Sequence, residues 1–268
     1  MDTATRVLTA LPTVPAHKIR RTAAWLAHLY PTDPDRYWST LQPDRIAEYH
    51  ATRTLAQGGV ALPTLLAAAA PDQQAQTVTV LARAAIAHYN ADRTVDTDHV
   101  LRTLDEALDA VPLAYQAAQV ASATLPYPSR VINPLAVRLT AAVTRTARQR
   151  SDELGLAAPL VILGARLFEA GRPTEALTAT EQAVHIYRRL AATDPTSHEP
   201  DLAASLRILG ARLSEAERPT EALPTTEQAV HIYRRLAATD PTAHEPRLAA
   251  SQTVWAMLLA SSGDLPEA

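Results

Sequence analysis

Two consecutive segments in the C-terminal half of the chain have nearly the same sequence. Residues 163–208 and 209–254 are identical at 37 of 46 aligned positions, and no residue separates the two copies. Self-similarity at such a period is typical of stacked repeat arrays, in which each unit buries its apolar face against its neighbours. The duplication therefore predicts a binding surface rather than a reaction centre, and it does not identify the partner.

Each copy is predicted to form a pair of helices. From just before the first copy, Leu160, Leu163 and Leu167 recur at spacings of three and four, with Ala170 on the same stripe, which indicates one helical face. Gly171 stands where a glycine commonly ends a helix, and Pro173 falls in the first turn of the next one. The second helix is expected to bury Leu177, Thr180, Ala183, Val184, Tyr187 and Leu190.

The end of each second helix is marked by Asp-Pro. Because the residue before proline avoids the α region, the helix is expected to stop at Asp194. The following residues, with the sequence TDPTSHEP (193–200), are predicted to be a loop that leads to the next first helix. The second copy repeats the register, with Glu217 in place of Gly171.

A third unit begins at Trp255 and is incomplete. The residues GDLPEA (263–268) align with GRPTEA (171–176) of the first copy. Terminal units of an array normally have a polar outer face, whereas Trp255, Leu258 and Leu259 are expected near an open end. We therefore expect this chain to be part of a longer array. The alternatives are that the last helix caps the array itself, or that the open C-terminal end mediates self-association.

The sequence upstream is helical in pattern but shows no clear repeat. The expected fold class is all-α, with a helical linker domain followed by an α-solenoid of antiparallel helix pairs. The expected divisions are a linker segment at 1–58, irregular degenerate helix pairs at 59–152 and the repeats at 153–268. The predicted upstream helices cover residues 17–29, 43–56, 60–69, 73–90, 97–109, 112–124 and 131–150.

Composition excludes several classes of protein. The formal net charge is −3, so no long-range field draws the chain to nucleic acid or to an anionic membrane. There are no cysteines, which excludes disulfides and thiolate metal sites. No apolar run approaches the roughly 20 residues that cross a bilayer, and the N-terminus lacks a signal-peptide pattern. These observations predict a soluble, cytoplasmic protein without a membrane partner.

The duplicated units resemble tetratricopeptide repeats. That family places a Leu-Gly pair, a Tyr and two Ala at fixed offsets, and Leu163-Gly164, Leu167, Ala176 and Ala183 match those positions, as do Leu209-Gly210, Leu213, Ala222 and Ala229 in the second copy. Thr180 and Thr226 depart from the pattern, since the family has Phe there. The long period resembles the kinesin-light-chain-like branch, and the resemblance implies an interaction protein.

Two upstream segments resemble parts of bacterial STAND-class signalling ATPases. They are residues 25–51 and 125–140, which in those proteins lie between the nucleotide-binding module and a C-terminal repeat array. A phosphate loop needs GxxxxGK[ST], but Lys18 is the only lysine and no glycine precedes it. The resemblance therefore implies the sensing and linking part of a signalling protein without its ATPase module.

Several residue groups suggest chemistry but are better explained by structure. His198-Glu199 and His244-Glu245 lack the HExxH spacing of a zinc site, so no metal or other cofactor is expected. His185–Arg189 recurs as His231–Arg235, which suggests a basic ridge, but glutamates on the same helices favour a solvated face. The aromatic residues Trp25, Tyr30, Tyr37 and Trp38 are expected to pack in the core rather than to stack on bases.

Two other functions are kept as alternatives. A transcriptional regulator associated with nucleic acid would use the basic ridge. An enzyme or enzyme accessory domain would use Asp44, Glu48 and His50, which share one predicted helix.

The favoured function is a non-catalytic scaffold or sensor that captures a peptide or protein in a concave groove lined by the first helices. Alanine fills the central groove position twice, which disfavours a carboxylate clamp and favours an apolar helix or extended peptide. The predicted groove positions are Val161, Ala165, Phe168 and Glu169 in the first unit, Arg207, Ala211, Ser214 and Glu215 in the second, and Thr253, Met257 and Ala260 in the third.

Overall fold

The computed structural model describes residues 8–9, 15–29 and 61–262. Within these ranges every regular element is a helix and no strand is present, which confirms the all-α prediction. By their internal contacts the residues divide into two units, Met1–Leu139 and Thr140–Ala268. The domain boundaries expected after residues 58 and 152 remain predictions.

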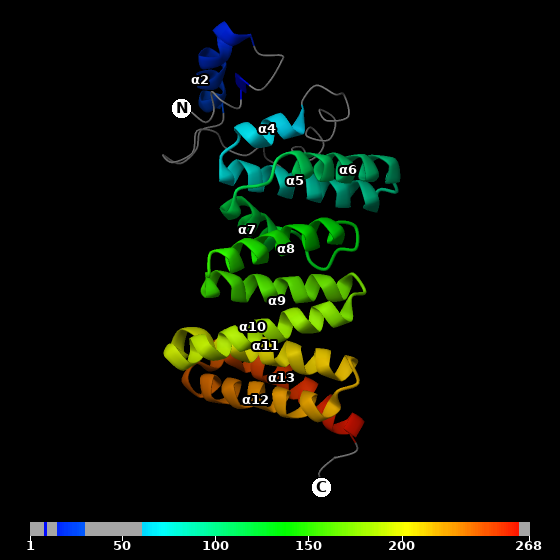
Figure 1. Cartoon of the computed structure of the whole chain (residues 1–268), viewed down its shortest axis with the longest axis vertical. Helices are drawn as coiled ribbons and strands as arrows, with labels where there is room; N and C mark the ends of the chain where they lie inside the picture. Colours follow the sequence, from blue (N-terminus) through cyan, green and yellow to red (C-terminus); the bar gives the residue numbers. More distant parts are fainter. Residues whose placement is uncertain (1–7, 10–14, 30–60, 263–268) are drawn as a thin grey trace. The chain divides into compact units, whose positions relative to one another are not determined.

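The first unit contains short and long helices that match the predicted ranges closely (Figure 1). The segment predicted as a helix at 43–56 lies outside the described residues. The β-branched run at 76–80 lies within a helix, as predicted. The helices are η1 (Ala16–Lys18), α2 (Ile19–Leu29), α4 (Leu62–Ala68), α5 (Pro71–Asn90), α6 (Thr94–Ala110), α7 (Tyr115–Thr124) and the first part of α8 (Asn133–Gln149).

One apolar core joins α4, α5, α6 and α7 in this unit. Leu66, Val78 and Leu104 are completely buried in it. The side chain of Gln74 is also buried; its amide donates to the Leu66 carbonyl (2.8 Å) and accepts from the Ala114 N–H (3.0 Å). Because both partners are backbone groups at helix ends, this one polar side chain holds α4 and α7 against α5.

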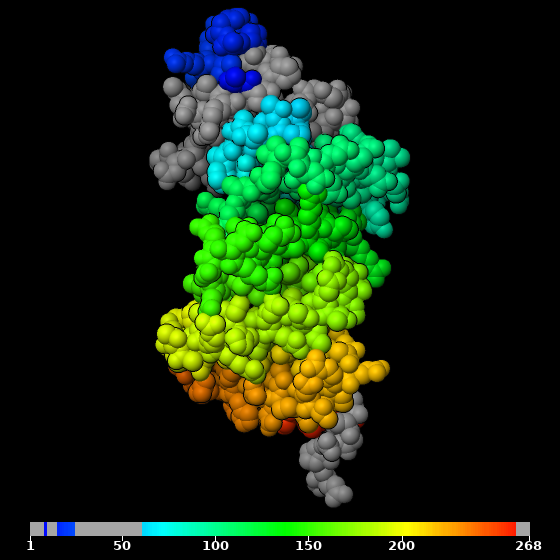
Figure 2. All heavy atoms as spheres, in the orientation of Figure 1, coloured from blue at the N-terminus to red at the C-terminus, as the bar shows by residue number. Residues whose placement is uncertain are grey.

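The second unit contains the duplicated sequence as consecutive antiparallel helices. Each helix contacts the next along the chain from α9 to α13, and α11 also contacts α13. Figure 2 shows α10, α11 and α12 packed closely on the drawn face. The helices are the rest of α8, then α9 (Glu153–Glu169), α10 (Pro173–Thr193), α11 (Pro195–Glu215), α12 (Pro219–Thr239) and α13 (Pro241–Ser262).

Left-handed residues end the first helix of each pair. Gly171 has φ 70° and Glu217 has φ 57°, and each is followed by an arginine whose N–H returns to the last turn, at Leu167 O and Leu213 O. Asp92 has φ 56° and Arg93 bonds to His88 O in the same way at the α5–α6 turn. The α5–α6 turn is thus built like those of the repeats, a likeness that the sequence analysis missed.

The predicted loop at 193–200 is wrong. Residues 195–200 are the start of α11, and the equivalent residues 241–246 start α13. The Asp194 carboxylate caps α11 by accepting the Ser197 N–H (3.2 Å), and Pro195 occupies the first turn, where its missing N–H costs nothing. Pro200 lies inside the helix, and its carbonyl accepts the Tyr233 hydroxyl (3.3 Å) from α12. The cap and this packing outweigh the local cost of an internal proline.

Small residues bring the two helices of each pair close together. A Cβ at Gly164 would lie 2.7 Å from Thr180 Oγ1, and one at Gly210 would lie 1.9 Å from Thr226 Oγ1. Both threonines are fully buried and bond back to Ala176 O and Ala222 O. Glycine facing a buried threonine therefore sets the close contact between the two helices of each pair.

Candidate partner-binding face

The predicted groove residues lie at equivalent, partly exposed positions of α9, α11 and α13. On α9 and α11 all of them are partly buried except Glu215, which is exposed, and on α13 Thr253, Met257 and Ala260 are exposed. We call these eleven residues the first-helix face. At its centre Ala165, Ala211 and Met257 follow one another at intervals of 46 residues, and Met257 is 66% exposed.

The helices that carry this face are in contact with one another. The guanidinium carbon of Arg212 lies over the ring of Phe168, 3.4 Å from its centroid, which joins α11 to α9. α11 contacts α13 directly. The structure thus brings the helices that carry the predicted residues into contact; a concave groove between them remains a prediction.

Two arginines beside the face were missed by the sequence analysis. Arg166 and Arg212 occupy the same position of the two sequence repeats, and the Arg166 side chain is only 2% exposed. Arg166 lies 3.9 Å from the Glu169 carboxylate, and Arg212 pairs with Glu215 at 2.8 Å. The signal in the sequence is the repeated LGARL, which places an arginine inside an otherwise apolar stripe.

These ion pairs decide the chemistry of the face. Each arginine is matched by a glutamate one turn later, so the pairs leave little net charge for an ionic ligand. What remains accessible between the pairs is mixed. Alanines and the apolar Val161, Phe168 and Met257 stand beside the hydroxyls of Ser214 and Thr253, and Arg207 is a partly exposed cation. Such a surface suits an apolar segment with few charges better than a free carboxylate.

The predicted basic ridge is largely used for contacts between helices. Arg188 donates to Gln228 (3.1 Å), Arg189 pairs with Glu153 (2.8 Å), and Arg235 makes the equivalent pair with Glu199 (2.5 Å). Arg148 on α8 donates to Gln182 as Arg188 does to Gln228. The C-terminal part of α8 therefore serves as the second helix of a preceding unit, although the sequence shows no repeat there.

The other sequence candidates are two histidines that the structure places in helices and several residues that it does not describe. His198 and His244 lie in the first turns of α11 and α13 rather than in loops, and the His244 ring packs 6.5 Å from that of Tyr233. Across residues 8–9, 15–29 and 61–262, no three His, Asp or Glu side chains gather as a metal site. Asp44, Glu48 and His50, with Tyr30, Tyr37, Trp38 and the Trp25 side chain, lie outside what the structure describes.

Two tyrosines in the repeats have perturbed acidity. Burial raises the pKa of Tyr187 to about 12, and the Asp201 carboxylate adds to the effect. Burial also raises the pKa of Tyr233, at the equivalent position of α12. Both hydroxyls belong to the packing between helices and not to the first-helix face.

The fold defines a class: an all-α protein whose repeats form a solenoid of antiparallel helix pairs. No protein-family model matches the chain, and no curated protein matches it. Among solved structures the chain is similar to the one titled "MamA RS-1 ArsTM double mutant", with 15% identity, a TM-score of 0.36, and coverage of 74% of this chain and 98% of that chain. Among the described residues no helix is both long and apolar enough to cross a membrane.

Proposed function

We propose that the chain is a non-catalytic interaction module that captures a peptide or protein segment on the first-helix face. The observation that carries the proposal is the alignment of Ala165, Ala211 and Met257 on three helices in contact, flanked by arginine–glutamate pairs. A strip of apolar side chains accepts the apolar side of a helix or an extended segment. The resemblance to tetratricopeptide repeats supports the same function.

The proposal is tested by selecting binders from a random peptide library on the purified chain. Selected peptides are expected to be apolar, and Ala165→Glu or Ala211→Glu should weaken them at least about tenfold because each puts an unpaired carboxylate in the strip. His185 is exposed on α10, so His185→Glu is the matched control, and it should leave the affinity of the selected peptides unchanged. Peptides that lose affinity equally with all three variants would contradict the proposal.

We also propose that the module senses partners for a signalling protein, as the resemblance of residues 25–51 and 125–140 to STAND-class segments implies. The isolated chain is then expected to lack ATP hydrolysis. Hydrolysis that disappears with Lys18→Ala would overturn this assignment, because Lys18 is the only lysine that could contact a phosphate.

A further inference from the structure

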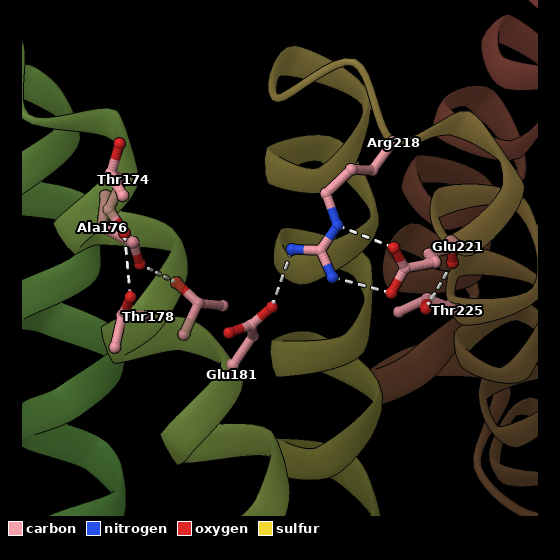
Figure 3. Close-up of polar contacts among 8 residues, drawn as sticks. Thr174, Ala176, Thr178, Glu181, Arg218, Glu221 and Thr225 are labelled. Carbon is pink, nitrogen blue, oxygen red and sulfur yellow. Dashed lines mark hydrogen bonds and ion pairs between the residues drawn. The ribbon is translucent and has the colours of Figure 1, made fainter.

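Contacts between the second helices join one repeat to the next. On α10, Glu181 accepts from Arg218, the residue that precedes α12 (3.2 Å), and Arg188 donates to Gln228 of α12 (3.1 Å). Figure 3 shows Arg218 between Glu221 on its own helix and Glu181 on α10. A third contact, from Arg235 of α12 to Glu199, joins α12 to the first helix of its own pair.

The next second helix, α12, presents the same groups without these partners. Glu227 and Arg234 are the equivalents of Glu181 and Arg188, and both are exposed. The contact of Glu227 is with His231 on the same helix, at 3.8 Å. In the described part of the chain Arg234 has no hydrogen bond or ion pair, so α12 displays an acceptor and a donor in the arrangement that α10 uses to hold a neighbour.

The first helix beside it, α13, is uncovered at the matching positions. On α11, Ala203 and Leu206 are buried at 0% and 1% exposure on the side that holds α12. Their equivalents on α13, Ala249 and Gln252, are exposed, and Glu245 stands where Glu199 pairs with Arg235. The face of α11 that binds α12 thus recurs on α13 with nothing from the described residues covering it.

We propose that the outer surface of α12 and α13, defined by Glu227, Arg234, Glu245, Ala249, Gln252 and Ala256, binds a further helix of the α12 type. The bound helix carries arginine to meet Glu227, glutamine ten residues later to meet Arg234, and arginine seven residues after that to meet Glu245, as Arg218, Gln228 and Arg235 do on α12. This surface is distinct from the first-helix face, and its partner is recognised by a different pattern of residues.

Ala256 adds a size requirement to this recognition. It is the equivalent of Gly210, where a Cβ would lie 1.9 Å from Thr226 Oγ1. An exact copy of α12 would therefore clash through its threonine. The helix that binds here carries alanine or glycine at that position, so the surface discriminates between helices that share the charge pattern.

The test uses a labelled synthetic peptide with the sequence of residues 217–240 and Thr226→Ala, titrated against the whole chain by fluorescence anisotropy. Saturable binding is expected, and it should be tighter than that of the peptide that keeps threonine. Glu227→Arg in the chain should weaken binding about fivefold or more, because it turns an attraction into a repulsion. Arg218→Glu in the peptide should restore affinity for that variant.

The control is Glu106→Arg, the same change of charge at an exposed site of the first unit, which should leave peptide binding unchanged. Peptides selected on the first-helix face should still bind the Glu227→Arg chain, which separates this surface from the proposed function. Absence of saturable binding would overturn the proposal. So would a loss of affinity with Glu227→Arg that the Arg218→Glu peptide does not reverse.

Discussion

At the scale of single residues, two glycines set the distance between the helices of each pair. Gly210 faces the buried Thr226 hydroxyl and the Ala222 carbonyl, and a Cβ there would lie 1.9 Å from the first and 3.2 Å from the second. The hydroxyl cannot simply swing away, because Thr226 is β-branched and bonded to Ala222 O. Close approach therefore depends on the absence of a side chain.

Gly210→Ala is expected to lower the free energy of unfolding of the Thr140–Ala268 unit by about 1–3 kcal/mol, the usual cost of overpacking a core. Gly164→Ala should cost less, since its nearest contact would be 2.7 Å. Adding Thr226→Ala to Gly210→Ala should recover part of the loss. Urea unfolding followed by circular dichroism measures all three, and a Gly210→Ala midpoint equal to that of the parent would refute the packing.

The raised pKa of Tyr187 predicts how the free energy of unfolding changes at alkaline pH. Burial raises the pKa of Tyr187 to about 12, whereas a tyrosine in the unfolded chain titrates near its ordinary value of about 10. The unfolded state therefore loses its proton first, so the stabilisation is full below the unfolded pKa and is lost as pH rises from about 10 to about 12. Tyr187→Phe should flatten the fall of the free energy of unfolding in that window. An unchanged slope would show that the hydroxyl is not buried.

The sequence predicts the burial of apolar residues at helical spacing better than it predicts the burial and contacts of residues whose partners lie on other helices. The stripe from Leu177 to Tyr187 is buried as expected, because helical spacing alone determines which side chains share a face. The burial of Arg166 and the stacking of Arg212 on Phe168 depend on neighbouring helices. Only the recurrence of arginine in LGARL could have indicated them.

At the scale of helices, equivalent positions of α11 and α13 have different surroundings. Leu206 is 1% exposed where α11 meets α12, and its equivalent on α13, Gln252, is exposed. Leu206→Ala should cost about 2–5 kcal/mol, as large-to-small changes in cores do. Gln252→Ala should change stability by less than about 0.5 kcal/mol. Thermal unfolding of the two variants makes the comparison; a large effect of Gln252→Ala would mean that this face is already covered.

Helix boundaries show where local rules are sufficient and where they fail. Gly171 and Pro173 correctly mark the α9–α10 turn, because a left-handed residue and a proline in the first turn act locally. The start of α11 was misplaced because Glu199 precedes a proline yet is held in the helix by the Asp194 cap and by contacts with α12. The role of α8 as a second helix depends on Arg148 and Gln182, which are far apart in the sequence.

At the scale of the whole molecule, the duplicated sequence provides the chain with two kinds of surface. The first-helix face is apolar at its centre, and the two arginines beside it, Arg166 and Arg212, are matched by glutamates. The outer surface of α12 and α13 carries exposed charged side chains at Glu227, Arg234 and Glu245. Because no residue belongs to both surfaces, the two proposals predict that a partner segment and a further helix contact different residues.

The most direct test of this account is a distance between spin labels at Ala165 and Met257. Because the chain has no cysteine, the double variant Ala165→Cys, Met257→Cys is labelled only at the two sites. If the repeats stack with their first helices in line, double electron–electron resonance should give one narrow distance distribution at about 16–20 Å, twice the 8–10 Å between packed helices. A broad distribution, or one centred far beyond that distance, would show that α9, α11 and α13 do not form one face.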